Sequence, residues 1–185
     1  MTGIDYDLEF LEDGHTIELI SIGMVCDDGR EYYAVNRDMP VRKIRKDKWL
    51  MENVVPSLPK GHGDQRIHMP KRWLFHYADH RVKPRGRIAN EVADFILKAG
   101  PGVELWANYG AYDHVCLAQL WGRMIDLPEG VPMFTRDIQQ ERARLGLAWD
   151  DLPKQESGEH NALADARHNQ VVRRWLKEQA ARSPA

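Results

Sequence analysis

The chain has 185 residues, of which 43% are hydrophobic and 29% are charged, values that fit one soluble globular domain with a substantial core. Its net charge of −2 argues against a general electrostatic attraction to nucleic acid, so any attraction to phosphate has to come from local patches or bound cations. The two cysteines, Cys26 and Cys116, make neither a disulfide framework nor a zinc site. We expect buried reduced thiols in a cytoplasmic protein without a signal peptide or membrane span.

The first strand carries a row of acids. Residues 4–10 alternate acidic and apolar side chains with a period of two, which is typical of a β-strand. Asp5, Asp7 and Glu9 therefore share one face, where adjacent carboxylates repel each other unless a cation lies among them. A solvated polar face on an edge strand is the alternative interpretation, and the period alone does not say which two acids belong together.

The remaining elements follow from turn signals and from changes of period. An Asp-Gly turn at residues 13–14 predicts a hairpin, so that the chain opens with three antiparallel strands. Further apolar runs and helical periods predict later strands at 103–107 and 133–135 and helices over 86–99, 113–124 and 137–147, and residues 160–165 lead into a last helix that ends at about 178.

The middle of the chain is basic and irregular. Five of the seven residues at 42–48 are basic, which predicts a short helix with a solvated basic side, or alternatively an RNA contact. Residues 60–87 hold eight Lys or Arg and four histidines, including His62 and His68. The spacing of His76 and His80 would place both on one helix face, but surface or core histidines are favoured over metal ligands. A basic flap over a nucleic-acid groove is the functional alternative.

Two later acids, Asp113 and Asp165, could join those of the first strand in one site. Asp113 lies at a helix start, where a cap is the ordinary interpretation, and His160 precedes Asp165 by five residues. Carboxylates without cysteine suit Mg²⁺ or Mn²⁺, and two such ions assist phosphodiester hydrolysis. A histidine has an intrinsic pKa suited to taking a proton from water. Five residues turn about 500° along a helix, so His160 is expected in the loop before the helix rather than on the face of Asp165.

These motifs resemble a known class. The set of Asp7 and Glu9, then Asp113, then His160 with Asp165 is similar to the three motifs of the DEDDh class of 3′–5′ exonucleases, which have a ribonuclease H-like fold. The longer strings resemble the mycobacterial-type 3′–5′ exoribonucleases: IDYDLEFLEDGHTIELISIG, ELWANYGAYDHVCLAQLWG, PMFTRDI and HNALADAR. The similarity spans most of residues 4–40 and 103–175, whereas 41–87 resembles the family poorly.

The resemblance implies an α/β fold, with a ribonuclease H-like mixed sheet of about five strands, three antiparallel first, flanked by helices on both faces. Residues 1–185 would form one exonuclease domain with a basic insert at about 41–87. The expected activity is stepwise hydrolysis of RNA from its 3′ end, releasing nucleoside 5′-monophosphates. Single-stranded RNA 3′ ends or 3′ overhangs are the expected partners. A DNA exonuclease of the same class and a non-catalytic nucleic-acid-binding module are the alternatives.

The resemblance also implies residue roles. Two Mg²⁺ or Mn²⁺ ions would be held by Asp7, Glu9, Asp113 and Asp165, with His160 as general base. The candidate substrate contacts are Leu8, Phe10, Glu18 and Trp106. Alternatively, Phe10 and Trp106 are core aromatic residues and Glu18 pairs with a basic residue.

Two further expectations concern surfaces and distances. Exposed aromatic residues around Trp49 and Trp73 could serve a homodimer. The metal hypothesis also requires the aspartates of the first and last motifs to lie no more than about a dozen ångströms apart.

Overall fold

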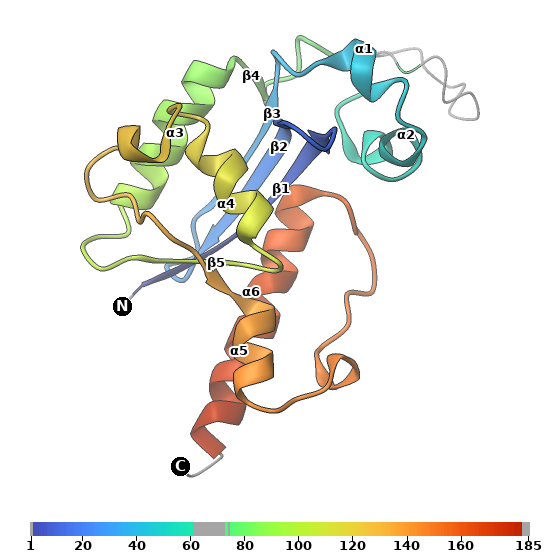
Figure 1. The fold of residues 1–185 in the computed structure, drawn as a ribbon. Helices are drawn as coiled ribbons and strands as arrows, with labels where there is room; N and C mark the ends of the chain where they lie inside the picture. The colour runs from blue at the N-terminus through green and yellow to red at the C-terminus, as the bar shows by residue number, and fades with distance from the viewer. Residues whose placement is uncertain (1, 61–72, 74, 183–185) are drawn as a thin grey trace.

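The described residues of the protein form a mixed sheet. The structure is a computed structural model that describes residues 2–60, 73 and 75–182, so the interpretations of His62 and His68 lie outside it. The sheet has six strands in the order β4-β3-β2-β1-β5-β6 (Figure 1). The strands are β1 (Gly3–Glu12), β2 (Ile17–Cys26), β3 (Glu31–Asn36), β4 (Val82–Lys83), β5 (Glu104–Ala107) and β6 (Arg136–Asp137).

The pairing of the strands confirms the predicted meander. β1 pairs antiparallel with β2, and β2 pairs antiparallel with β3, whereas β5 pairs parallel with β1 and β6 pairs parallel with β5. The sheet has one strand more than expected. The additional strand is β4, which is only two residues long, lies within the irregular residues 60–87 and pairs with β3 at the edge of the sheet. The last strand follows the predicted 133–135 run at residues 136–137.

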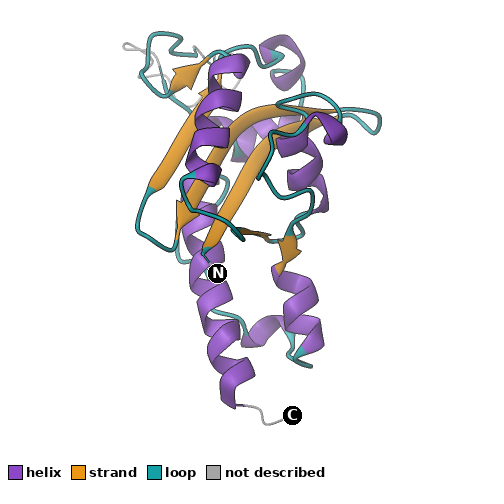
Figure 2. Ribbon diagram, turned by 90° about the vertical axis from the view of Figure 1, so that its left-hand side faces the viewer, coloured by secondary structure: helices purple, strands orange, loops and turns teal. Residues whose placement is uncertain are grey.

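Helices cover both faces of the sheet, as the alternation along β1 requires (Figure 2). Apolar side chains such as Tyr6 pack with α3 and α4 on one face, whereas Asp5 on the other face contacts α6. The helices are α1 (Val41–Ile44), α2 (Lys48–Asn53), α3 (Arg85–Leu97), α4 (Ala111–Ala118), α5 (Ile138–Arg144) and α6 (Ala162–Arg182), with 3₁₀ turns η1 (Val55–Ser57), η3 (Met124–Asp126) and η4 (Trp149–Asp151). This is the mixed α/β architecture that the resemblance implies.

The long helix α6 is attached to the sheet by a buried ion cluster and by close packing. Arg173 is 1% exposed and donates to both oxygens of Asp5 at 2.8 and 2.7 Å and to Asp27 at 2.6 Å. At the other end of the contact, a Cβ on Gly23 of β2 would overlap backbone atoms of Ala162 and Leu163. Only a glycine therefore lets the start of α6 come this close to the sheet.

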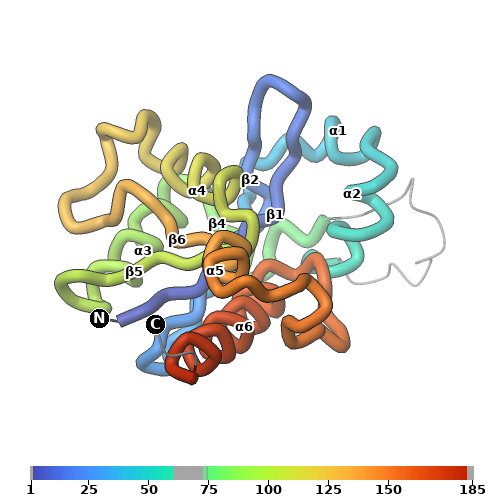
Figure 3. The backbone as a smooth tube through the Cα atoms, turned by 60° about the horizontal axis from the view of Figure 1, so that its bottom comes forward, coloured from blue at the N-terminus to red at the C-terminus, as the bar shows by residue number. Residues whose placement is uncertain are grey.

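Residues 41–57, here called the helical segment, form α1, α2 and η1. Their apolar side chains make a second core with strand residues such as Ile20 and Val35. Figure 3 shows this segment beside the hairpin of β1 and β2. The segment is therefore packed against the sheet through its apolar side, as the prediction of a helix with a solvated basic side requires.

Several smaller expectations can be compared with the structure. Trp73 was expected to be exposed, but it is 5% exposed because it packs in the second core. His76 and His80 lie in a non-helical segment, so their spacing does not place them on one helix face. Cys26 and Cys116 are buried free thiols, as predicted. Within the described part of the chain, no helix has the length and apolar character needed to cross a bilayer.

Candidate active site

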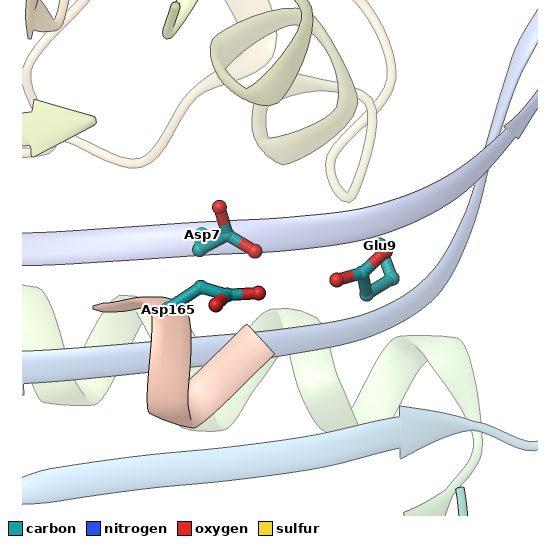
Figure 4. A group of neighbouring side chains, drawn as sticks. All are labelled: Asp7, Glu9 and Asp165. Atoms are coloured by element: carbon teal, nitrogen blue, oxygen red, sulfur yellow. The ribbon is translucent and has the colours of Figure 1, made fainter. Parts of the chain in front are cut away.

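Three carboxylates from distant parts of the sequence meet on the α6 face of the sheet. Asp7 and Glu9 project from β1 toward Asp165, which lies in the first turn of α6 (Figure 4). One carboxylate oxygen of each residue lies within 4.8 Å of those of the other two. This spacing is well within the limit that the metal hypothesis sets.

The backbone of β1 and β2 aims these side chains. Asp7 and Glu9 share a face because they are two residues apart on a strand. The register between the strands shifts directly after Glu9, and such bulges often re-aim side chains beside active sites. Gly23 pairs with Asp7, so the close approach of α6 occurs beside the acids. Strand register and helix packing thus set the spacing of the cluster together.

Asp113 lies near this group without being one of the three, and its charge acts on both Asp7 and Glu9. It lies in the first turn of α4 and is 7% exposed. Its position alone would suggest a cap, but the N-cap position is Gly110 and no side-chain cap is formed. Instead, Asp113 Oδ1 accepts a hydrogen bond from the backbone N–H of Leu8 at 2.8 Å. This bond attaches α4 to β1 between Asp7 and Glu9.

The cluster is electrostatically unfavourable without a cation. Burial raises the pKa of Asp7 well above its ordinary value, and the neighbouring carboxylates raise it further. Burial, followed by repulsion from Asp165 and Asp113, raises the pKa of Glu9 to about 8. Burial also raises the pKa of Asp113 to about 7. Across the described residues, none of these carboxylates has a Lys or Arg ion-pair partner.

This donor set fits hard divalent cations. Oxygen ligands are what Mg²⁺ and Mn²⁺ prefer, and a bound dication would offset the repulsion that raises these pKa values. Asp5 could not serve in the same way, because Arg173 already neutralises it. The geometry therefore favours Asp7 with Glu9 as ligands, the pair that the resemblance implies and the period alone left open.

His160 lies in the loop that leads into α6, as predicted, and adopts a left-handed backbone conformation with φ of 61°. Its carbonyl accepts a hydrogen bond from Ser57 Oγ at 2.8 Å, and its ring meets Trp49 edge-on with centroids 4.9 Å apart. Burial raises the pKa of Asp165, and the hydrogen bond from Gln155 and the nearby charge of His160 oppose that shift. His160 is therefore close enough to Asp165 to interact with it electrostatically.

Gln155 is a site residue that sequence reasoning missed. Its amide donates to Asp165 Oδ1 at 2.7 Å and borders a cavity of about 440 Å³ that Asn108, Gln139 and Trp149 also line. A cation that binds this oxygen of Asp165 competes with the amide. Residues 154–159 are mostly polar, and no pattern in the sequence distinguishes Gln155 from other polar loop residues.

The candidate substrate contacts lie in different surroundings. Phe10 is half-buried and stacks on the exposed ring of Tyr112, with centroids 6.3 Å apart. Glu18 lies 3.5 Å from Lys43 in an ion pair. Trp106 is 7% exposed in a core cluster with residues of α5 and α6. Leu8 is 4% exposed and packs in the main core.

The site combines carboxylates of the first and last motifs with Asp113 of the second motif nearby, an oxygen donor set of the kind that two-metal nucleases use. Comparison with known proteins agrees with this class. A family model described as the 3′–5′ exoribonuclease Rv2179c-like domain matches residues 71–176. The chain belongs to this family.

Two relatives come from Mycobacterium tuberculosis. They are 3′–5′ exoribonuclease Rv2179c of strain ATCC 25618 / H37Rv and 3′–5′ exoribonuclease MT2234.1 of strain CDC 1551 / Oshkosh. Each is 42% identical over 168 residues, which cover 88% of this chain and 85% of the relative. A solved structure of S. pombe Pop2p with Mg²⁺ and Mn²⁺ bound is 12% identical, with a TM-score of 0.40 over 96% of this chain and 82% of Pop2p.

Proposed function

We propose that this protein is a metal-dependent 3′–5′ exoribonuclease that removes nucleotides one at a time from RNA 3′ ends as nucleoside 5′-monophosphates. The observation that carries the proposal is the group formed by Asp7, Glu9 and Asp165, whose oxygens lie within 4.8 Å of one another. Membership of the exoribonuclease family supports RNA as the polymer. Single-stranded 3′ ends or 3′ overhangs are the form of RNA that we expect it to bind.

The acids would hold two Mg²⁺ or Mn²⁺ ions through Asp7, Glu9, Asp113 and Asp165. Bound divalent ions stabilise the charge that develops on the phosphate and on the leaving 3′-oxygen during in-line displacement. The protein supplies a partly buried, preorganised set of oxygens for this purpose. Asp113 also fixes the backbone of β1 through Leu8 N–H, so it would keep Asp7 and Glu9 in place as well as bind metal.

His160 would act as the general base that takes the proton from the attacking water. It lies outside the helix, close to Asp165, and a neutral imidazole nitrogen can accept a proton near neutral pH. Asp165 would therefore have two roles, as a metal ligand and as the carboxylate that stabilises the imidazolium once the proton has moved.

The test is an assay of purified protein on a 5′-labelled single-stranded RNA with Mn²⁺. We expect a ladder of products shortened from the 3′ end, with nucleoside 5′-monophosphates released, and no shortening in EDTA. Asp165→Asn and His160→Ala should each lower turnover by about a hundredfold or more. Asp126→Asn is the matched control, because this exposed carboxylate pairs with Arg123 outside the acid cluster.

Three outcomes would contradict the proposal. Full activity in EDTA would exclude a metal-dependent reaction. Binding of RNA without shortening would favour a non-catalytic binding module. Equal or faster hydrolysis of a DNA oligonucleotide of matched sequence would favour a DNA exonuclease, since the 2′-hydroxyl distinguishes the two polymers.

Three expectations stay predictions. They are a homodimer, a cytoplasmic location and the treatment of residues 1–185 as one exonuclease domain. For a dimer, Trp49 is 53% exposed, whereas Trp73 is buried and cannot contribute to a surface.

A further inference from the structure

The helical segment contacts the proposed general base at two points. Ser57 Oγ lies 2.8 Å from the carbonyl oxygen of His160 and 2.8 Å from that of Val54, so the two carbonyls share its single hydroxyl proton as acceptors. The Trp49 ring meets the His160 ring at an interplanar angle of 78°. One contact therefore acts on the backbone of His160 and the other on its side chain.

The backbone of His160 adopts a conformation that is uncommon outside glycine. Its φ of 61° lies in the left-handed region, which costs a residue with a side chain some free energy, although histidine adopts it more often than most. Strained residues of this kind persist where the surroundings hold them, and they gather at functional sites. The hydrogen bond from Ser57 restrains the peptide that carries the strained residue.

The helical segment is itself well anchored. Asp47 caps α2 by accepting a hydrogen bond from Leu50 N–H at 2.9 Å. Leu50 is buried in the second core, and so is Val55, two residues before Ser57. Trp49, by contrast, is 53% exposed, so packing in a core does not account for its position over His160.

We propose that the helical segment is a positioning device for His160, in which Trp49 restricts rotation of the imidazole and Ser57 holds its backbone. This inference rests on the proposed role of His160 as general base. A base has to stay within hydrogen-bond reach of the proton that it abstracts, and small displacements cost large factors in rate. Both residues act through His160 and are positioning residues, not catalytic ones.

The main experiment measures kcat and KM on a short single-stranded RNA with Mn²⁺. Trp49→Leu should lower kcat about tenfold and leave KM within about twofold, because orientation of the base affects turnover rather than binding. Trp49→Phe keeps a ring and should recover part of the loss. Ser57→Ala should lower kcat several-fold, and Ser57→Thr, which keeps a hydroxyl, should restore it.

Two controls separate positioning from folding and from substrate binding. Tyr77→Leu removes another half-exposed ring, one that meets Phe75 edge-on 4.8 Å away, and should leave kcat unchanged. In a His160→Ala background, Trp49→Leu should have no further effect, because the residue through which it acts is gone. Thermal unfolding tests whether each variant is folded. The chemical shifts of the His160 ring in the metal-free protein test whether the surroundings of the ring change.

Each other result overturns the inference in a recognisable way. A rise in KM that persists in the His160→Ala background would show that Trp49 stacks on a base of the RNA. A fall in kcat that follows loss of folded protein would show a structural role only. If His160→Ala abolishes turnover but Trp49→Leu and Ser57→Ala do not lower it, positioning fails and the proposed function stands. If His160→Ala leaves turnover intact, both fail.

Discussion

Two carboxylate clusters lie along the contact between β1 and α6, and they solve the same electrostatic problem differently. In one cluster, Asp5 is neutralised by Arg173, which reaches across from α6. In the other, Asp7 and Glu9 meet Asp165 from the same helix. Both clusters join one face of β1 to α6, with Asp27 of the turn after β2 added to the first, and the alternation that exposes Asp5 to α6 also exposes Asp7.

The difference teaches which cluster maintains the fold and which needs an added cation. Arg173 supplies a built-in positive charge, so the Asp5 cluster is complete within the chain. The acid cluster, meaning Asp7, Glu9 and Asp165 with the neighbouring Asp113, has no such partner among the described residues. The pKa values of Asp7, Glu9 and Asp113 are raised. Reducing the charge should therefore have opposite effects on stability in the two clusters.

The largest expected effect comes from Asp7→Asn set against Asp5→Asn. Asp7→Asn should lower exonuclease turnover about a thousandfold while leaving the unfolding free energy unchanged or higher, because a repelled buried carboxylate becomes neutral. Asp5→Asn should lower the unfolding free energy by about 2–3 kcal/mol and turnover by less than about tenfold. Assays on labelled RNA and urea unfolding of both variants measure the contrast. If well-folded Asp5→Asn lost activity as completely as Asp7→Asn, the division between the clusters would be wrong.

A second prediction concerns Arg173, the positively charged residue of the Asp5 cluster. Arg173→Met should destabilise the fold by about 3–5 kcal/mol, because it leaves Asp5 charged and buried without its partner. Urea unfolding followed by circular dichroism measures the loss. The double variant Asp5→Leu with Arg173→Met should recover most of it, since both charges are then removed. A single variant as stable as the parent protein would contradict the inferred role of Arg173.

The smallest expected effect is a pH dependence of stability in EDTA. The pKa of Glu9 in the folded protein is about 8, above its ordinary value of 4.5, so the unfolded state loses this proton first and stability falls as pH rises from about 4.5, levelling off above about 8. Between about pH 7 and about pH 8.5 this loss should reach about 1 kcal/mol. Chemical unfolding at each pH measures it.

Glu9→Gln is the control for this effect, because its amide does not titrate. The pH slope should be shallower in this variant than in the parent protein. Mn²⁺ should reverse the trend in the parent, because the cation binds the deprotonated carboxylates and binding to the folded state adds stability. Identical slopes for the two proteins in EDTA would show that Glu9 does not titrate in this range.

The sequence supported prediction of the fold because its local signals agreed with one another. The alternation along β1, the Asp-Gly turn and the 3.6-residue period of α3 each correspond to an observed element. Asp7, Glu9, Asp113 and Asp165 were candidates because their motifs occur in order with the spacing of a known class. Those motifs carried a specific signal because the chemistry requires particular side chains.

Other parts of the site could not be predicted, for physical reasons. Ser57 contacts His160 across 103 positions of sequence, and a lone serine before a basic loop has no distinguishing pattern. Gln155 reaches Asp165 only because of the path of its loop. The motif makes Asp113 a candidate ligand, but its bond to Leu8 depends on how α4 packs on β1, which no local pattern predicts. Long-range packing, rather than local propensity, decides these contacts.

Gly23 has a consequence that reaches beyond its own position. A single added methyl group there would press on the backbone at Ala162 and displace the start of α6. Asp165 and the adjoining loop with His160 would then shift together, so the acid cluster would widen without the loss of any functional atom. The separation of α6 from the sheet, which the missing side chain of Gly23 permits, is therefore a condition for the spacing of the acids.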